Sequence, residues 1–131
     1  MSLRHRVKLF VSNLREKRKD HQRSPEWKRV REKFIKDNPK CAACGETNHL
    51  QVHHIMPFHL HPELELDPNN LVVLCMDINE CHLLIGHGDS WKSYNPNVKK
   101  DVVRFNSSDK PHRQFIIEDI RSKRIYGINH S

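Results

Sequence analysis

The sequence predicts a small α+β domain whose centre is a strand–loop–strand–helix unit held together by a metal ion. Two observations predict this α+β fold class. Short β-like runs occupy the middle of the chain, and apolar residues at helical spacing occur on both sides of it. A third predicts the metal, because all four cysteines and seven of the eleven histidines lie between Cys41 and His87. We expect one domain over residues 1–131, with helical support in 1–39, the core in 41–87, and C-terminal helical support and a tail in 88–131.

Composition narrows the partners of this domain. The chain has 131 residues, 36% of them hydrophobic, so its core is small and benefits from a metal staple. A formal net charge of +7 is typical of a domain that meets nucleic acid or another polyanion, and the alternative is a solvated basic surface without such a partner. No stretch is apolar enough to cross a bilayer, and no secretory leader is evident, so we expect a cytoplasmic protein. In that reducing compartment, cysteines favour metal ligation over disulfides.

Two helices are expected before the first cysteine. Residues 3–20 carry apolar side chains on one face and a basic surface on the rest. Ser24 and Pro25 then start a second helix, which ends at Asn38-Pro39. Its apolar stripe consists of Trp27, Val30, Phe34 and Ile35. Since Trp27 is in register with this stripe, we interpret it as a core anchor.

The centre of the chain alternates between β and helical patterns. Residues 50–55 read as a strand that Pro57 ends, and residues 71–74 read as a second, apolar strand. The segment 59–68 between them is a proline-containing loop. A short helix follows through residues 81–85, with Asp77 or Asn79 as its cap.

The C-terminal third is less regular. We expect Trp91 to close the core and leave the role of its neighbour Lys92 open. Residues 98–105 indicate one or two helical turns, residues 114–125 a helix, and residues 126–131 a frayed tail.

The cysteines have the spacing of a zinc site. Cys41 and Cys44 are separated by two residues, which allows both thiolates to reach one ion, and Gly45 permits the tight turn behind them. Cys75 and Cys81 supply the second half, with the five residues between them bulging outwards. The alternative is four buried free thiols. A bound zinc ion would contribute folding free energy directly.

A longer pattern resembles a known family. His53-His54-Ile55, then Asn70 before LVVLC, then Cys81-His82 resembles the HNH endonuclease family, and the leading Cys-x-x-Cys is similar to its zinc-bearing members. The run IGHGDSW resembles phage-encoded members. The resemblance covers the central third of the chain. It implies a ββα-metal fold, in which two strands and a helix hold one divalent ion.

The resemblance also implies roles for individual residues. His53 and His82 would bind the catalytic ion, and His54 would be the general base that activates water. Asn70 would hold the loop and orient the base. His87 is an alternative or extra ligand, although its spacing from His82 is one residue longer than the i, i+4 step of an α-helix. The five-residue gap before Cys81 departs from the two residues usual in the family.

The implied activity is hydrolysis of DNA phosphodiester bonds, nicking one strand. The expected cofactors are structural Zn²⁺ and catalytic Mg²⁺, Mn²⁺ or another divalent transition metal. Arg29 and Lys92 are candidate nucleic-acid contacts. DNA is the expected partner, phage packaging proteins are further candidates, and we expect a monomer or weak dimer. If the chain is phage-encoded, its compartment would be the host cytoplasm.

Three other readings compete with this one. A zinc-stapled nucleic-acid-binding module without catalysis explains the cysteines and the charge, but it does not need the histidines. A ring-finger-like interaction domain needs more ligands than this chain has. A zinc-dependent deaminase finds its His-x-Glu in His61-Pro62-Glu63, but no Pro-Cys-x-x-Cys follows.

Overall fold

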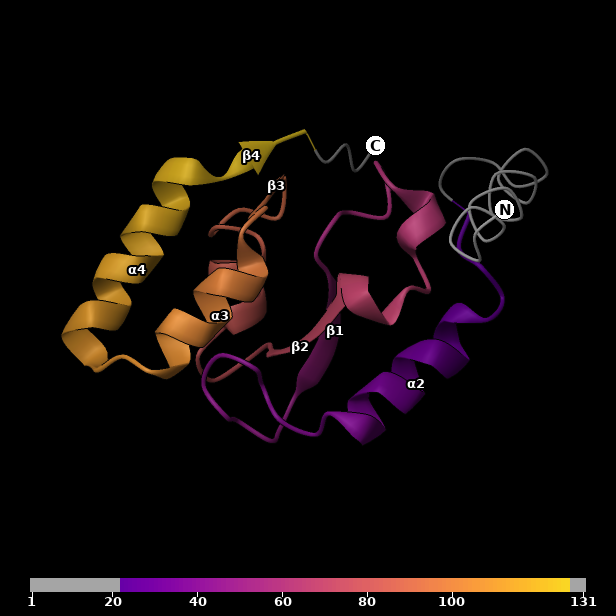
Figure 1. The fold of residues 1–131 in the computed structure, drawn as a ribbon, viewed down its shortest axis with the longest axis horizontal. Coiled ribbons are helices and arrows are strands. Elements are labelled where there is room, and N and C mark those ends of the chain that lie inside the picture. The colour runs from indigo at the N-terminus through magenta and orange to yellow at the C-terminus, as the bar shows by residue number, and fades with distance from the viewer. Residues whose placement is uncertain (1–21, 128–131) are drawn as a thin grey trace, which may run out of the picture.

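A computed structural model describes residues 22–127 of the chain (Figure 1). The helix expected over residues 3–20 lies outside the described residues, as does the end of the tail. The central elements are β1 (Leu50–His54), β2 (Leu71–Cys75) and a π-helix (His82–Gly86). The flanking elements are α2 (Trp27–Asp37), α3 (Val98–Asn106), α4 (Lys110–Lys123), β3 (Ser93–Tyr94) and β4 (Ile125–Tyr126). This confirms the small α+β fold with a ββα centre.

The two central strands form an antiparallel hairpin. Leu50 pairs with Cys75, and His54 pairs with Leu71 at the other end. Two short 3₁₀ turns, Pro62–Leu64 and Pro68–Asn70, shape the connection that we expected to be an irregular loop. Each turn begins with a proline, whose fixed φ suits the start of a helical turn.

Helix α2 covers one face of this hairpin. Val52 and Val73 project from that face, and the half-buried stripe of α2 packs on them. The stripe consists of Trp27, Val30, Phe34 and Ile35, as expected. None of these four is fully buried, so α2 is a cover for the strands and not the centre of the core.

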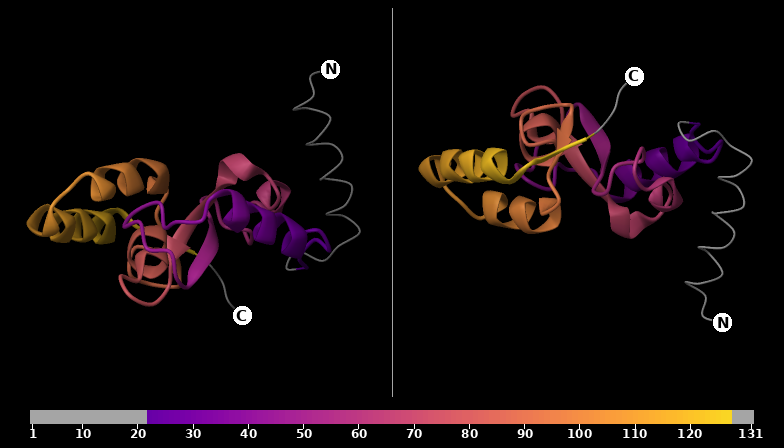
Figure 2. Two further views of the ribbon diagram at one scale, coloured as in Figure 1. Left: turned by 90° about the horizontal axis from the view of Figure 1, so that it is seen from below. Right: turned by 90° about the horizontal axis from the view of Figure 1, so that it is seen from above.

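The larger core lies on the other side, under α3 and α4. It combines side chains from β2, the π-helix and both C-terminal helices with three of the cysteines. Its largest fully buried apolar side chains are those of Leu74, Ile85, Val98 and Ile120. Figure 2 shows α3 and α4 side by side, across the hairpin from α2. The larger core therefore includes three of the four cysteines, and Cys44 packs against it.

Helix α4 begins four residues earlier than predicted. Its start is Lys110, because the Asp109 carboxylate accepts a hydrogen bond from the His112 amide and Pro111 suits the first turn. Arg104 joins α3 to α4 through Asp119. Phe115, one of the apolar residues of this helix, is 68% exposed.

The tail and Trp91 also differ from expectation. Ile125 and Tyr126 form β4, which pairs with β3, so the helix ends before Ile125 and Tyr126 is not frayed. Trp91 is 42% exposed and does not close the core. Its ring packs instead against the imidazoles of His82 and His87.

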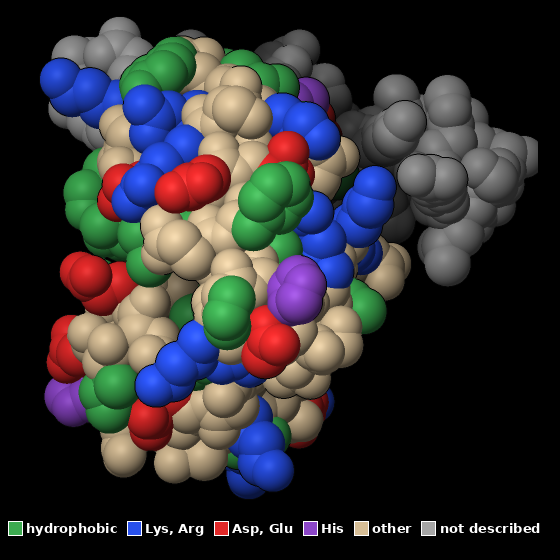
Figure 3. Space-filling view, turned by 90° about the vertical axis from the view of Figure 1, so that its left-hand side faces the viewer, with side chains coloured by type: hydrophobic (Ala, Val, Ile, Leu, Met, Phe, Trp, Pro, Cys, Tyr) green, Lys and Arg blue, Asp and Glu red, His purple; other side chains and the backbone are tan. Residues whose placement is uncertain are grey.

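The end of the molecule formed by the C-terminal helices carries no single dominant charge. Figure 3 shows basic, acidic and hydrophobic side chains intermixed on that face. Within residues 22–127, no helix has the length and apolar character needed to cross a membrane.

Candidate functional site

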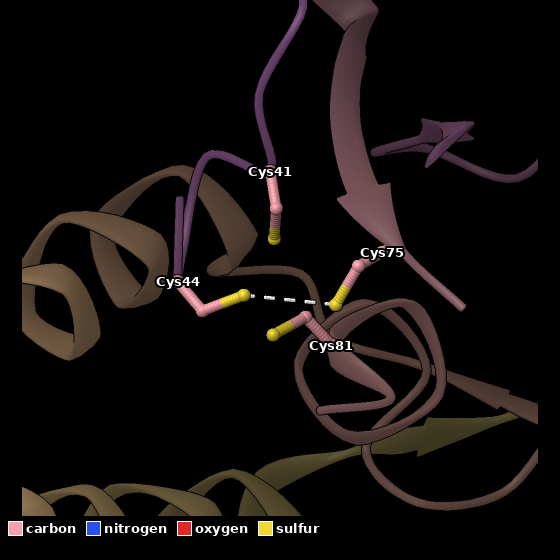
Figure 4. A group of neighbouring side chains, drawn as sticks. All are labelled: Cys41, Cys44, Cys75 and Cys81. Atoms are coloured by element: carbon pink, nitrogen blue, oxygen red, sulfur yellow. Dashed lines mark hydrogen bonds between the residues drawn. The ribbon is translucent and has the colours of Figure 1, made fainter. Parts of the chain in front are cut away.

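Four sulfur atoms gather at the edge of the core. The Sγ atoms of Cys41, Cys44, Cys75 and Cys81 all lie within 4.8 Å of one another, and that of Cys44 is 3.7 Å from that of Cys75. Figure 4 shows them converging from the loop after α2, the end of β2 and the start of the π-helix. Zinc–sulfur bonds of about 2.3 Å in a tetrahedron require sulfurs about 3.8 Å apart. The cluster therefore fits a zinc ion.

Local backbone structure brings these cysteines together. The Gly45 amide donates to the Cys41 carbonyl, and Gly45 has a φ of +80°, which favours glycine. The Ala42 amide donates to the Val73 carbonyl and so joins the loop to β2. Residues 76–80 bulge into solvent, as predicted, and Glu80 returns the chain with a φ of +49°.

The thiols of Cys41 and Cys81 shift each other's pKa values in opposite directions. The Cys81 thiol hydrogen bonds to Cys41 and, with three backbone amides, lowers the pKa of Cys41 to about 4. That same hydrogen bond, followed by burial, raises the pKa of Cys81, and burial raises the pKa of Cys75. A cation is what would let all four ionise together, so the donor set suits a divalent ion.

Three imidazoles form a second cluster. The rings of His53, His82 and His87 lie 4.9 to 5.0 Å apart, centroid to centroid, and their ligand nitrogens lie within 4.8 Å of one another. Nε2 of His53 is buried and has no hydrogen-bond partner within the described residues. An orphaned buried nitrogen carries a free-energy penalty that a bound metal would remove. The arrangement therefore fits a three-histidine metal site.

The π-helix explains how His87 joins this cluster. The His87 amide donates to the carbonyls of His82 (3.1 Å) and Leu83 (3.3 Å). An i→i+5 turn places residues five apart on one side, so the extra residue that would misalign an α-helix aligns this one. Cys81, and not Asp77 or Asn79, precedes the first turn, and no side chain caps it. The predicted cap is wrong because the cysteine cluster, not a capping side chain, determines where the helix begins.

The outer nitrogens of two imidazoles are held by oxygen atoms. Nδ1 of His82 lies 3.0 Å from the amide oxygen of Gln51, and Nδ1 of His87 lies 2.8 Å from the carbonyl of Ser93. Because these oxygens only accept, each Nδ1 carries the proton and Nε2 becomes the ligand atom. Burial lowers the pKa of His53 well below its ordinary value and that of His82 to about 3. Both are therefore neutral and can bind a metal.

His54 occupies a different position. Its Nε2 donates to the Glu65 carbonyl (2.9 Å), which leaves the lone pair on Nδ1, and its ring packs 4.5 Å from that of Trp27. The structure does not bring His54 into the three-histidine cluster, because neighbouring strand residues project to opposite faces. It is still near enough for its charge to lower the pKa of both His53 and His82. Burial lowers its own pKa to about 4.

Asn70 joins the loop to the end of β1. Its side-chain oxygen accepts from the Met56 amide (2.8 Å), and its side-chain nitrogen donates to the carbonyls of Met56 (3.1 Å) and Leu64 (3.3 Å). The residue after Leu64 is Glu65, whose backbone carbonyl accepts the hydrogen bond from His54. Asn70 therefore acts on the candidate base through the loop.

Two residues that contribute to the candidate site were not predicted from the sequence. Glu65 has a buried carboxylate that accepts from the Ser24 amide (3.0 Å) and pairs with Arg23 (3.5 Å), and nothing in the sequence marks it. Gln51 was detectable, because it lies two residues before His53 and so on the same face of the strand.

The two candidate DNA contacts are both exposed. Arg29 projects from α2 and pairs with Glu26 at 2.8 Å. Lys92 follows Trp91, whose ring lies 5.2 Å from that of His82 and 4.8 Å from that of His87. Lys92 is thus next in the chain to a residue that packs on the three-histidine cluster, and Arg29 is on the exposed side of α2.

Fold and site together define a ββα unit that carries one cysteine cluster suited to zinc and one histidine cluster suited to a divalent metal. Residues 41–88 match the family model of the HNH endonuclease, and this segment contains both clusters. HNH domains act on DNA, and the family generally consists of endonucleases. No curated protein and no solved structure matches the chain.

Proposed function

We propose that the protein is a divalent-metal-dependent DNA endonuclease that nicks one strand, with His54 as general base. The observation that carries this proposal is the convergence of His53, His82 and His87, with Nδ1 of His82 and His87 held from outside. A nucleic-acid-binding module has no use for such a site beside its structural metal. We further propose that residues 1–131 form one nuclease domain; phage packaging partners and a monomer or weak dimer remain predictions.

The proposed mechanism follows from the hydrogen bonds. His54 donates from Nε2 to the Glu65 carbonyl, so Nδ1 accepts a proton from water as the hydroxide attacks the phosphorus. His53, His82 and His87 would hold the ion, which when bound stabilises charge on the phosphorane and the leaving 3′ oxygen. Asn70 keeps the Glu65 loop, and through it His54, in position.

The ligand chemistry favours some ions over others. Three imidazole nitrogens suit Mn²⁺, Co²⁺, Ni²⁺ or Zn²⁺, whereas Mg²⁺ prefers oxygen ligands and retains its water. We therefore propose that a transition metal supports faster cleavage than Mg²⁺. The cysteine cluster would hold structural Zn²⁺.

The decisive experiment incubates supercoiled plasmid with the protein and a series of divalent ions, with EDTA as the blank. We expect metal-dependent nicking by the wild type. His54→Ala should lower its rate by about 10²–10⁴-fold without loss of zinc. His112→Ala, an exposed histidine on α4, is the matched control and should nick normally.

The rival non-catalytic module makes the opposite prediction. DNA binding that EDTA does not change, with no nicking by any ion, would favour it. Wild-type nicking by His54→Ala would remove the general base from the mechanism.

A further inference from the structure

A groove runs between α2 and β1 on the His54 side of the hairpin. Its volume is about 370 Å³, within the range of pockets that hold small ligands. The residues that line it are Arg23, Trp27, Arg31, Ile35, Leu50, Gln51, Val52 and His54. These include aliphatic side chains that could contact a sugar, but no aspartate or glutamate.

Two arginines line the groove, and only one of them has an acidic partner among the described residues. Arg23 and Arg31 both line it, and the charge of Arg31 contributes, after burial, to a lowered pKa of Arg23. Arg23 pairs with the buried carboxylate of Glu65, which is not among the lining residues. Arg31 is exposed, and no ion pair to it occurs among residues 22–127. An anion in the groove would be attracted by both arginines and would give Arg31 a partner of opposite charge.

The groove also reaches both parts of the proposed catalytic apparatus. His54 lines it, and so does Gln51, whose side-chain oxygen holds the metal-ligand candidate His82. If the scissile phosphate is held at His54, an adjacent phosphate of the same strand can enter the groove that His54 and the two arginines line.

We infer that the α2–β1 groove is a subsite for the phosphate that flanks the scissile one. Arg31 makes the principal contact, because Arg23 is already engaged by Glu65 and is held against Trp27 and Phe58, with its guanidinium carbon 5.4 and 4.3 Å from their ring centroids. Trp27 is a positioning residue between the arginines and the proposed base. Its ring packs on that of His54 and keeps the groove adjacent to it. This inference rests on the proposed nuclease function.

The test removes one charge from each partner. A 20-base-pair duplex carries a neutral methylphosphonate at one position at a time on either side of the cut. Its cleavage is compared for wild type, Arg31→Gln and Lys28→Gln. Lys28 is an exposed cation on the same helix but does not line the groove, so it controls for lost net charge. Arg31 is exposed, so its variant should fold.

We expect Arg31→Gln to raise KM about 10-fold, with kcat little changed. The slope of the logarithm of the DNA-binding constant against the logarithm of the salt concentration should fall by about one unit, the contribution of one phosphate contact. The wild type and Lys28→Gln should be sensitive to methylphosphonate at one flanking position, and Arg31→Gln should be insensitive there. Equal sensitivity of all three proteins at every position would overturn the subsite. Absence of cleavage by the wild type on unmodified duplex would instead overturn the nuclease function.

Discussion

His82 and His87 are five residues apart, yet one π-turn brings their imidazoles to 5.0 Å, centroid to centroid. The same turn presses Gly86 against His53, the third member of the cluster. A Cβ atom at position 86 would lie 3.1 Å from Nδ1 and 3.2 Å from Nε2 of that ring. The turn therefore positions two imidazoles and confines the third.

The first prediction concerns Gly86. Gly86→Ala should move the buried His53 ring, because its Cβ would be closer than ordinary contact allows. Small displacements of catalytic groups cost up to about 10²-fold in rate, and an extra methyl in a packed site costs about 1–3 kcal/mol of stability. Metal-dependent nicking and thermal melting measure the two effects. Unchanged nicking at limiting metal would show that the ring position is not critical.

The second prediction concerns Gln51, whose oxygen fixes the tautomer of His82. Gln51→Ala should weaken binding of the catalytic metal by about 10–100-fold, because partners of ligating histidines have effects of this size. Isothermal titration with Mn²⁺ or Ni²⁺ provides the measurement. Gln114→Ala, an exposed residue of α4, should bind as the wild type does. If both variants bind equally, Gln51 has no role in holding the ligand.

The third prediction concerns zinc. Cys44→Ser should release the structural ion and lower the melting temperature sharply, because the cysteine cluster is part of the larger core and its metal contributes folding free energy. Serine has nearly the shape of cysteine, so the loss reports ligation and not packing. Metal content and thermal melting are measured on the same preparation. A normal melting curve for Cys44→Ser would mean that the four sulfurs do not hold a metal.

The fourth prediction concerns pH. Burial lowers the pKa of His54 to about 4, against the opposing effect of the Glu65 carbonyl and with a smaller contribution from Arg23. A metal on the neighbouring histidines would act in the same direction. The base is active when neutral, so the acid limb of the single-turnover rate should lie well below the ordinary histidine pKa of about 6.5. A limb at pH 6.5 or above would contradict this.

The same shift has a consequence for stability. Between pH 6.5 and 4 the unfolded chain protonates this imidazole and the folded chain does not. The free energy of unfolding should therefore fall as the pH drops through that window. Urea denaturation of the wild type and His54→Ala at pH 7 and pH 5 measures it, and the variant should lose less stability on acidification.

Local sequence patterns determined several elements of the fold and of the candidate site. The spacing of Cys41 and Cys44, the strand on either side of His53-His54, and the apolar stripe of α2 are all properties of short segments, so they could be predicted from the sequence. The match to the HNH endonuclease family model covers residues 41–88, the segment in which these cysteine and histidine patterns lie. The stripe of α2 was also placed correctly on the core side, because helical period alone determines which residues share a face.

Tertiary structure decided the rest. Whether His87 reaches the cluster depended on a π-turn, which sequence periodicity does not reveal. Trp91 packs on the rings of His82 and His87 and is 42% exposed, a contact that its own sequence neighbourhood does not specify. Glu65 acts through contacts with Arg23 and Ser24, which belong to a distant segment of the chain. The groove with Arg31 exists only where α2 crosses β1. Local pattern specifies which residues share a face, but only packing specifies what that face meets.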